Sequence, residues 1–402
     1  MMKLLSRDAL RRLLTDIARS ELGPEQDVER RMSALDSIDR LRLAGRVNSF
    51  FRLYDIGTED NLLRMSSIEG WMDVVEHSFT ARPPAFAFRT SGSTDTPHEI
   101  THTSVVLAQE IEELSALFAH TGRIVSTVSS LHIYGFLWTA LLPDALRVPF
   151  IDARGFSVHQ WSTELTAGDL VVSFPEFLHY LGESVQRFPA AEAVSSTAPL
   201  SASTSRQLVN RGLSRVWEIY GSTETAGVGY RTSPDEPFSL MRFWRRKEGD
   251  TGTTIVRTRP QDREHPGELA ADEVSLPDNI NWCGERTFLP AGRLDGAVQV
   301  GGVNVYPMKI AAAIRTIAGV RDAYVRKMRS EEGDRLKALV IPDKPESQKG
   351  HLTTERISEW IAANLPAAER PVSVRLVDEF PKNEMGKPDD WDIAVGPSGS
   401  IE

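Results

Sequence analysis

The stretch FRTSGSTDTPHEITHT, residues 88–103, concentrates small side chains that can bind an anion. It holds five threonines, two serines and one glycine, and it has no lysine. Such residues form a flexible loop with many O–H and N–H donors, which can surround phosphate oxygens without bulky side chains. The phosphate loop GxxxxGK[ST] is absent. Because a run of this kind is more often an ordinary polar surface loop, it decides little alone.

Further motifs follow in a fixed order. They are SSTAPLS at 195–201, YGSTET at 220–225, LPDNINWCGERTFLPAGRLDG at 276–296, GGVNVYPMKI at 301–310 and FPKNEMGKPD at 380–389. In this order the chain resembles the adenylate-forming superfamily, which includes acyl-CoA synthetases, aryl-acid ligases and the adenylation domains of peptide synthetases. The resemblance covers roughly residues 85–390, and GVNVYP is similar to relatives of phenylacetate–CoA ligase.

The resemblance implies a site for ATP. The hydroxyl-rich loop would hold the β- and γ-phosphates through Thr90, Ser91, Gly92, Ser93 and Thr94. On the adenine side it implies Ala198, Pro199 and Tyr220, with the tyrosine stacked on the ring. Thr223 would contact the α-phosphate, and Glu224 would hold Mg²⁺. One carboxylate plus phosphate oxygens is a ligand set that Mg²⁺ prefers.

The remaining implied positions lie nearer the C-terminus. Asp278 would bind both ribose hydroxyls, and Arg293 would make a second contact to ribose or phosphate. Asp295 falls at the hinge between a large and a small domain. Lys387, on the small domain, would neutralise charge as a carboxylate attacks the α-phosphate.

Each of these residues also has an ordinary structural explanation. Tyr220 could be a core tyrosine, and Glu224 a carboxylate at a helix start. Asp278 could cap a turn, and Lys387 could be any loop lysine. For any one of these residues the structural explanation is at least as good as the functional one. The ordered set of motifs favours the functional interpretation.

Three features depart from the superfamily pattern. Its phosphate loop usually ends in Pro-Lys, whereas this chain has Pro97-His98. An imidazole is a weaker phosphate partner than an ammonium group, so ATP affinity could be lower unless Arg89 or His102 compensates. The usual TGD triplet before the ribose contact is LPD here, and the loop starts near residue 90, which indicates a shortened N-terminal scaffold.

Residues 34–75 resemble an acyl-carrier domain. The segment Asp36-Ser37-Ile38 matches the carrier motif whose serine receives phosphopantetheine, which makes Ser37 the matching position. Asp-Ser before an apolar-periodic helix is equally a good helix start. Carrier recognition helices are typically acidic, but Arg40, Arg42 and Arg46 follow. We therefore expect a helix that begins at residue 36 or 37 and an unmodified Ser37.

The acid that the site would activate is less defined. His132 resembles the superfamily position that gates the acyl pocket, although a packed core histidine is as good an explanation. Gly221 and Gly227 could leave room for substrate, with Phe136, Trp138 and Trp217 as walls. These residues favour a small aryl acid such as a hydroxybenzoate, and a medium-chain fatty acid stays open. Short ligases of this kind resemble those of aryl-polyene pigment pathways.

We expect the activated acid to pass to the thiol of a carrier protein, and transfer to CoA is the alternative. Residues 296–387 contain 15 lysine and arginine residues against 12 aspartate and glutamate residues, in a chain of formal charge −10. This mildly basic segment could bind an acidic carrier or the phosphates of CoA. Two other classes of function remain: a non-catalytic nucleotide or ligand sensor derived from a ligase, and a scaffold whose N-terminal region recruits partners.

Composition and patterning set the framework for these sites. The acidic balance argues against nucleic-acid binding, the single Cys283 rules out a disulfide framework, and no window is apolar enough for a membrane span, so we expect a cytoplasmic protein. The apolar, strand-like runs RIVSTVSS, LRVPFID, DLVVSFP and VWEIYG alternate with helical patterns, which favours an α/β fold. We expect a helical, carrier-like domain over 1–79, a shortened adenylation core over 85–294 and a mobile α+β domain over 296–390.

Overall fold

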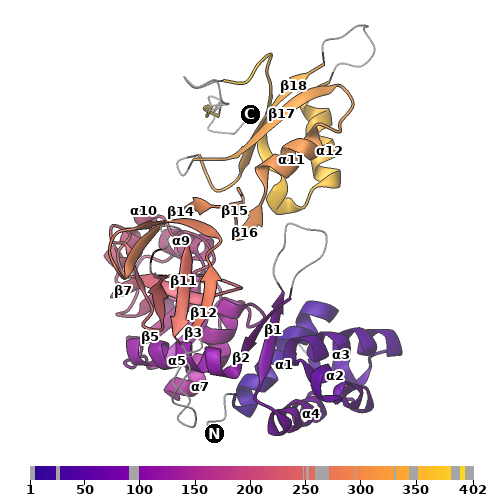
Figure 1. Cartoon of the computed structure of the whole chain (residues 1–402), viewed down its shortest axis with the longest axis vertical. Coiled ribbons are helices and arrows are strands. Elements are labelled where there is room, and N and C mark those ends of the chain that lie inside the picture. The colour runs from indigo at the N-terminus through magenta and orange to yellow at the C-terminus, as the bar shows by residue number, and fades with distance from the viewer. Residues whose placement is uncertain are drawn as a thin grey trace. The chain divides into compact units, whose positions relative to one another are not determined.

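The structure is a computed structural model of the chain (Figure 1). It describes residues 5–23, 28–89, 99–247, 249, 253–258, 271–294, 296–329, 332–343, 352–381 and 390–393. Contacts divide these residues into two compact units, which are described separately. Of the described residues, the larger unit takes in those up to Leu276 together with Ile280–Leu289, and the smaller unit takes in Pro277–Asn279 and those from Pro290 onward.

A nine-stranded sheet forms the centre of the larger unit, in the order β13-β14-β9-β8-β7-β6-β5-β3-β4. Five neighbouring strands are parallel: β3 (Arg123–Ser126), β4 (Phe150–Asp152), β5 (Asp169–Ser173), β6 (Glu192–Ser195) and β7 (Arg215–Ser222). Beyond β7 the sheet continues with β8 (Ala226–Arg231), β9 (Phe238–Leu240), β14 (Thr287–Arg293) and β13 (Asp278–Trp282). The pairs β7–β8, β8–β9 and β9–β14 are antiparallel. Four of the parallel strands, all but β6, lie in the apolar runs that predicted them, which confirms the α/β class.

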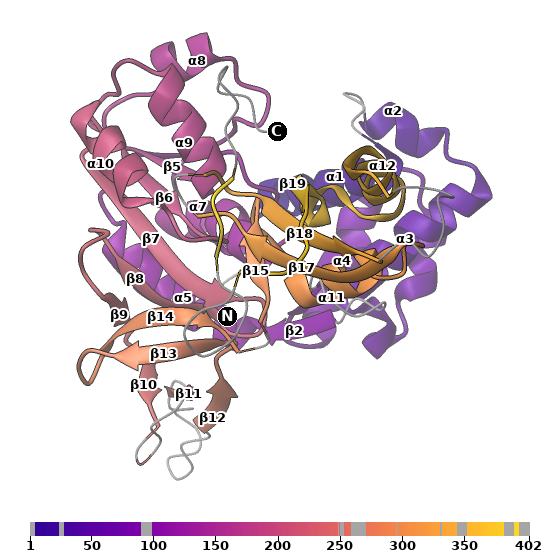
Figure 2. The same cartoon turned by 90° about the horizontal axis from the view of Figure 1, so that it is seen from above.

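Both faces of the parallel strands are covered by helices, as expected for strands that are apolar throughout. Successive side chains of a strand point to opposite faces. Val171 of β5 packs in a core with α8 (Val158–Thr163), α9 (Pro175–Ser184) and α10 (Ala202–Asn210). Its neighbours Leu170 and Val172 pack on the other side, in a core that includes α5 (Ser104–Leu117). Figure 2 shows α9 and α10 on one side of these strands and α5 on the other.

The N-terminal helices share that second core. They are α1 (Arg7–Leu22), α2 (Val28–Ser33), α3 (Ser37–Phe51) and α4 (Ile68–Ala81), followed by the hairpin β1 (Ala85–Arg89) and β2 (Glu99–Thr103). Phe50, Phe86, Phe88 and Phe136 form one aromatic group with ring centroids 4.7 to 6.1 Å apart. These helices pack directly against the hairpin and the turn after β3. The prediction that residues 1–79 form a separate domain stays a prediction.

The predicted start of α3 is confirmed. Asp36 is its N-cap, and its carboxylate accepts hydrogen bonds from the N–H groups of Ile38 and Asp39. Of the three arginines that distinguish this helix from the acidic helices of carriers, Arg46 is buried, so it does not contribute to an exposed basic face. Ser37 is exposed at the first position of the helix.

Two further groups of elements complete the larger unit. After β3 the chain forms α6 (Ile133–Gly135), the π-helical turn η3 (Phe136–Leu141) and α7 (Leu142–Leu146). A three-stranded sheet consists of β10 (Trp244–Arg246), β11 (Thr254–Thr258) and β12 (Ala271–Ser275). Among the described residues, no helix is long and apolar enough to cross a membrane.

The smaller unit is an α+β structure with a core of its own. A hairpin of β15 (Val298–Val300) and β16 (Val303–Val305) precedes α11 (Pro307–Ile314). The sheet β17-β18-β19 consists of Val320–Lys327, Leu336–Pro342 and Pro371–Leu376, with α12 (Thr354–Asn364) between the last two strands in sequence. The segments AVQVGGVNVYP, DAYVRKM and LKALVIP have the pattern of strands, and PMKIAAAIRTI and TTERISEWIAANL have that of helices. The structure has strands or helices of the predicted kind in all five, and α11 ends at Ile314, before the last residues of its segment.

Candidate active site

The carboxyl ends of the parallel strands meet at one edge of the central sheet. Register places Ser195, at the end of β6, beside Glu218 of β7, and Ser126 of β3 beside Val172 of β5. The turns that follow β3, β6 and β7 therefore begin at this edge. Open α/β sheets bind ligands there, so the structure brings together the loops that carry His132, Ala198-Pro199 and Thr223-Glu224.

The turn after β6 is held in an uncommon backbone conformation. Thr197 has φ +78°, a left-handed conformation that a β-branched residue rarely adopts. The Ser196 hydroxyl donates to the Ile219 carbonyl of β7 at 2.9 Å, which fixes the start of the turn. Ala198 is half-buried and Pro199 is exposed, as expected for residues that present a surface to a ligand.

The turn between β7 and β8 carries three of the predicted residues. Tyr220 is half-buried, and its ring lies 5.3 Å from the ring of Phe288 and 5.8 Å from that of Phe238. Thr223 is half-buried and Glu224 is exposed at the tip. Neither Tyr220 nor Glu224 is a fully packed core residue, which leaves both accessible for the predicted contacts.

Glu224 meets only part of what a divalent cation needs. No group of three or more His, Cys, Asp or Glu side chains in the described ranges could hold a metal ion. Mg²⁺ is usually bound by one or two carboxylates together with substrate phosphates and water. The exposed carboxylate of Glu224 fits that arrangement. It does not fit a site in which protein side chains alone hold the ion.

The two glycines predicted to leave room for substrate have tight packing of their own. A Cβ on Gly221 would lie 2.1 Å from the Ala226 carbonyl oxygen, across the irregular β7–β8 pairing. A Cβ on Gly227 would lie 2.3 Å from Glu110 Oε1 and 2.8 Å from Met241 Cε. Close backbone approach accounts for glycine at both positions, and contact with substrate stays a prediction.

Beneath the turn, buried polar side chains from three elements bind its backbone. His102 Nε2 of β2 lies 2.6 Å from the Thr223 carbonyl oxygen, and Arg257 Nη2 of β11 donates to the Thr225 carbonyl at 2.8 Å. Burial lowers the pKa of His102, which disfavours the protonated ring. A role of His102 in place of the missing lysine of the phosphate loop stays a prediction. Arg89, the other candidate, pairs with Glu99 at 3.1 Å.

Glu110 of α5 is the third of these side chains. Its carboxylate accepts the Gly227 N–H at 3.0 and 3.1 Å. Burial raises its pKa to about 7, and the charge of Arg257 opposes that rise. The sequence offered no signal for Glu110 or Arg257, because neither belongs to a local motif.

The titration of Glu110 predicts a pH effect on stability. The carboxyl has its ordinary pKa of 4.5 in the unfolded chain and about 7 in the folded one. Its contribution to stability is therefore full below about pH 4.5 and is lost as pH rises through 7. Urea unfolding of the wild type and Glu110→Gln at pH 5 and pH 8 should show a stability difference that changes between the two pH values. An unchanged difference would contradict the pKa.

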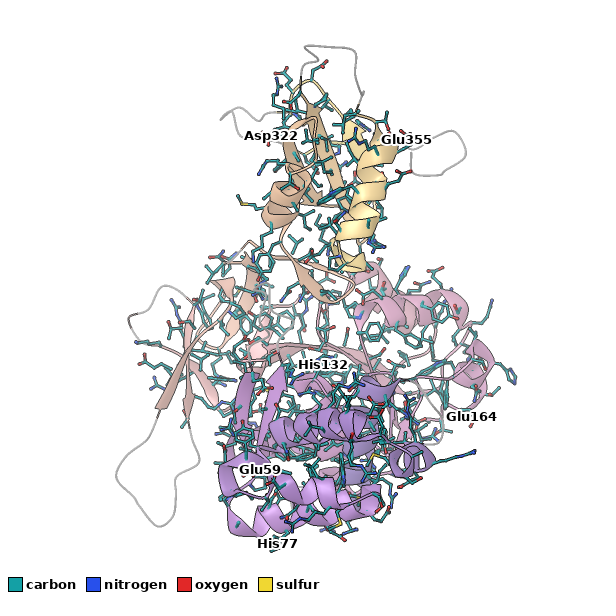
Figure 3. All side chains as sticks on the ribbon, turned by 90° about the vertical axis from the view of Figure 1, so that its right-hand side faces the viewer. Glu59, His77, His132, Glu164, Asp322 and Glu355 are labelled. Atoms are coloured by element: carbon teal, nitrogen blue, oxygen red, sulfur yellow. The ribbon has the colours of Figure 1, made fainter. Side chains whose placement is uncertain are left out.

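His132 lies in the turn after β3, directly before α6 (labelled in Figure 3). It is exposed, so it is not the packed core histidine that was the alternative explanation. Even so, neighbouring protein atoms lower its pKa by desolvation, and the charge of Arg46 lowers it further. The turn packs tightly, because a Cβ on Gly135 would lie 1.8 Å from the Ser129 carbonyl oxygen.

Two predicted residues belong to the smaller unit. Asp278 begins β13 and Arg293 ends β14, and both are half-buried. The Leu294 N–H donates to the Pro277 carbonyl at 2.9 Å, so these two ends of the hairpin lie side by side. Asp278 and Arg293 are thus neighbours in space although 15 positions apart in sequence. Their contact with ribose stays a prediction.

Comparison with known proteins supplies the family. The family description "AMP-binding enzyme C-terminal domain" matches residues 309–387. The chain is 34% identical over 352 residues to a 4-coumarate–CoA ligase of Halorhodospira halophila, which covers 88% of this chain and 87% of that protein. It is also 34% identical over 373 residues to a 4-coumarate–CoA ligase of Cereibacter sphaeroides, covering 89% of this chain and 83% of that protein.

The chain belongs to the AMP-binding, adenylate-forming enzymes of the acyl-CoA ligase type. The o-succinylbenzoate CoA synthetase of Bacillus subtilis has the same fold, with a TM-score of 0.56 at 16% identity over 75% of this chain and 67% of that one. The matches to the coumarate ligases extend over most of both chains. The shortened N-terminal scaffold stays a prediction.

Several residues predicted for this AMP-binding enzyme lie outside the described part of the chain. These are Thr90, Ser91, Gly92, Ser93, Thr94 and His98 of the hydroxyl-rich loop, Asp295 at the expected hinge, and Lys387. Their roles stay predictions.

The aromatic residues proposed as pocket walls are core residues. Phe136, Trp138 and Trp217 are 0%, 1% and 4% exposed. Phe118 packs against both tryptophan rings at 5.0 and 4.9 Å. Large aromatic side chains stabilise a core by burying area, and nothing about these three indicates a substrate wall.

Proposed function

We propose that this protein activates a hydroxyaryl carboxylic acid with ATP and transfers the acyl group to the thiol of CoA. The observation that carries the proposal is the meeting of two nucleotide motifs at one sheet edge. The turns with Ala198-Pro199 and Thr223-Glu224 follow the neighbouring parallel strands β6 and β7. The similarity to two 4-coumarate–CoA ligases supports the kind of acid and the acceptor.

The first half-reaction makes a leaving group. A carboxylate is a poor electrophile and must be activated before a thiol can attack it. Its oxygen attacks the α-phosphorus of ATP. The bond to the β-phosphate breaks, pyrophosphate leaves and an acyl-adenylate forms. In this step Tyr220 would stack on the adenine, Asp278 and Arg293 would hold the ribose side, and Thr223 would contact the α-phosphate. In-line transfer needs positioning and charge neutralisation more than covalent help from the protein.

Charge neutralisation falls to a few groups. Glu224 would hold Mg²⁺, which when bound screens the phosphate oxygens. The hydroxyls and N–H groups of Thr90–Thr94 would surround the β- and γ-phosphates, and Lys387 would approach the reacting oxygens. Because Lys387 belongs to the C-terminal region, movement about Asp295 would bring it to the site and remove it afterwards.

In the second half-reaction the thiolate sulfur attacks the acyl carbon, the acyl–phosphate bond breaks and AMP leaves. The protein needs no nucleophilic cysteine for this, and Cys283 is exposed in the hairpin turn between β13 and β14. The names of the relatives favour CoA as acceptor. A phosphopantetheine carrier is the second candidate, because the segment 296–387 is mildly basic and carriers are acidic.

Finer parts of the sequence interpretation remain proposals. A hydroxybenzoate is the second candidate for the acid, beside a hydroxycinnamate. The carrier-like nature of residues 1–79, a role in an aryl-polyene pathway and a cytoplasmic location stay predictions. A nucleotide sensor or a scaffold without catalysis would require that no acid is activated at all.

Hydroxylamine trapping of the acyl-adenylate tests the proposal. Purified protein is given ATP, Mg²⁺ and one acid at a time from a panel of hydroxycinnamates, hydroxybenzoates and medium-chain fatty acids. We expect at least one hydroxyaryl acid to be turned over about tenfold faster than any fatty acid. Thioester formation is then compared with CoA and with a phosphopantetheinylated carrier, using the unmodified carrier as control. Preference for a fatty acid would overturn the acid class, and no activity with any acid would favour the sensor or the scaffold.

A further inference from the structure

A buried polar group lies directly beneath the turn that carries Thr223 and Glu224. We infer that His102 and Arg257 are positioning residues that set the peptide orientation of this turn for MgATP. The inference rests on the proposed function and deepens it, because it names residues that act through the nucleotide turn without touching the substrate.

The turn cannot set its own conformation completely. Ser222 N–H donates to Thr225 Oγ1 at 3.0 Å, and Thr225 N–H donates to Ser222 Oγ at 3.3 Å. These bonds close the turn at its base. Ala226, which ends it, has φ +57°, a conformation that a non-glycine residue adopts at a cost. Contacts from outside the turn must offset that cost.

His102 supplies the contact at the tip. Its Nε2 lies 2.6 Å from the Thr223 carbonyl oxygen, and the side chain is buried. A carbonyl only accepts, so Nε2 must carry the proton and donate it. Because the C=O and N–H of a trans peptide point in opposite directions, this bond directs the N–H of Glu224 away from His102. The bond therefore determines which way the backbone donor beside Thr223 faces.

Arg257 and Glu110 hold the other side of the turn. The Arg257 guanidinium is 3% exposed, donates to the Thr225 carbonyl at 2.8 Å and lies 4.4 Å from the centre of the Trp244 ring. The Trp244 Nε1–H donates to the Gly227 carbonyl at 2.8 Å, while Glu110 accepts the Gly227 N–H. The peptide groups of Thr225 and Gly227 are thus bound by side chains of three elements, α5, β10 and β11.

The arrangement links two motifs that are far apart in the sequence. His102 lies on β2, the strand that directly follows the hydroxyl-rich stretch, and Thr223 is 121 positions later. Without the His102 donor, the Thr223 carbonyl loses this partly buried hydrogen bond. The peptide between Thr223 and Glu224 can then populate other orientations. The expected consequence is weaker use of MgATP with little effect on the affinity for the acid.

The test compares amide side chains of two lengths at position 102. In His102→Gln the amide nitrogen can reach the Thr223 carbonyl and donate, whereas in His102→Asn it is too short, and His102→Leu has no donor. We expect kcat/KM for MgATP to fall about 10- to 100-fold in the Asn and Leu variants and less than about fivefold in the Gln variant. KM for the acid should change by less than about threefold in all of them. His159→Leu, at an exposed histidine on α8, is the matched control and should behave as wild type.

Arg257 gives an independent measurement. Arg257→Lys keeps a charge and one donor, and Arg257→Met keeps only the volume, so the Met variant should lose more kcat/KM for MgATP than the Lys variant. Thermal unfolding of each variant checks that it is folded. The inference is wrong if the Asn and Gln variants at 102 have equal kinetics, or if the loss appears mainly in KM for the acid.

The proposed function can fail separately. If the wild type activates no acid, calorimetric MgATP binding by the same variants still tests the positioning role. The wild type and Gln variant should then bind MgATP about tenfold more tightly than the Asn and Leu variants. Equal affinities would overturn the inference, whatever the acid is.

Discussion

Replacing Lys387 by alanine is expected to lower the rate of acyl-adenylate formation by about 100- to 1000-fold while leaving the Kd for MgATP within about threefold of wild type. The physical reason is that charge builds up at the reacting phosphate only in the transition state. Removal of a group that stabilises developing charge costs about that much. A contact made only in the transition state affects kcat and kcat/KM equally and spares ground-state binding.

The measurement separates the two half-reactions. Pyrophosphate release or hydroxamate formation reports adenylation, and CoA-thioester formation from a supplied acyl-adenylate reports the second step, which should stay within a few-fold of wild type. Lys382→Ala, five residues earlier in FPKNEMGKPD, is the matched control. Adenylation that stays within a few-fold of wild type in Lys387→Ala would contradict the assignment.

Replacing Lys337 by methionine is expected to lower the stability of the smaller unit strongly. Lys337, on β18 of the smaller unit, is 0% exposed. Its Nζ lies 2.7 Å from Glu332 Oε2, 3.0 Å from Asp390 Oδ1 and 2.6 Å from the Trp391 carbonyl oxygen. Removing one partner of a fully buried ion pair costs about 3–5 kcal/mol. Glu332 and Asp390 keep their ion pairs with Arg329, and Asp390 is partly exposed, so we expect a loss at or below the lower end of that range.

The titration of Glu332 agrees with that role. Hydrogen bonds from Arg329 and then from Lys337 lower its pKa to about 2, from an ordinary 4.5. The stability that this carboxylate contributes is therefore present above about pH 4.5 and is lost as pH falls toward 2. In Lys337→Met the pKa of Glu332 should move back toward its ordinary value, so acid unfolding of the smaller unit should begin at higher pH.

Hydrogen exchange of the β18 amides measures the effect inside the smaller unit, without assuming that both units unfold together. Lys327→Met, on the neighbouring strand, removes a lysine that pairs with Asp334 at the surface and should cost less than about 1 kcal/mol. Adding Glu332→Gln and Asp390→Asn to Lys337→Met should recover part of the loss, since no charge is then left buried. Equal protection of β18 in the wild type and Lys337→Met would contradict the prediction.

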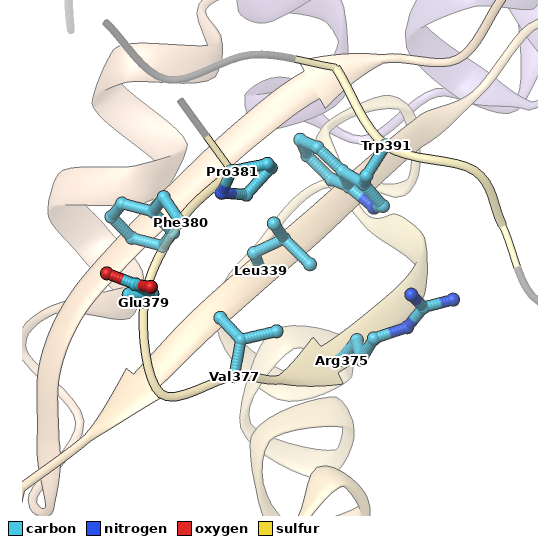
Figure 4. A pocket seen from close by; sticks show the side chains of 7 residues that line it. All are labelled: Leu339, Arg375, Val377, Glu379, Phe380, Pro381 and Trp391. Carbon is cyan, nitrogen blue, oxygen red and sulfur yellow. The ribbon is translucent and has the colours of Figure 1, made fainter. Parts of the chain in front are cut away.

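We expect Lys337 to affect the proposed reaction as well, because Asp390 and Trp391 follow Lys387 by three and four positions. Trp391 lines a pocket of about 420 Å³ together with Leu339, Arg375, Val377, Glu379, Phe380 and Pro381. Figure 4 shows Leu339 between the side chains of Phe380 and Trp391. Pro381 precedes residues 382–389 and Trp391 lies shortly after them, so the segments on either side line one pocket with Leu339 of β18. Loss of the Lys337 contacts should lower adenylation as well as stability.

Much of the fold could be read from local sequence. The runs RIVS, FID, DLVVS and VWEIY became parallel strands because a sheet covered on both faces buries most side chains of its inner strands, while FID, at the sheet edge, is only partly buried. Asp36 predicted the start of α3 because an aspartate side chain binds the first free N–H groups of a helix. The order of five motifs was enough for the superfamily, and similarity over most of the chain confirmed it.

The surroundings of the site were decided by tertiary structure. The sequence shows only that residues 136, 138 and 217 are aromatic. Their burial in the structure shows that Phe136, Trp138 and Trp217 belong to the core. Arg46 has the helical spacing of an exposed basic residue, yet it is buried beside Glu21. Gly221 and Gly227 were assigned to substrate, but close packing already requires glycine there: the Ala226 backbone across the hairpin lies against Gly221, and the distant Glu110 and Met241 lie against Gly227.

The sequence by itself determined which residue types stand at the nucleotide turns, because Thr223, Glu224 and Tyr220 belong to one continuous motif. It could not determine what holds the backbone of that turn. His102, Glu110 and Arg257 come from three elements and reach one turn only after the sheet has formed. Side chains of this kind follow no local period, since the contacts that select them join residues more than 30 positions apart.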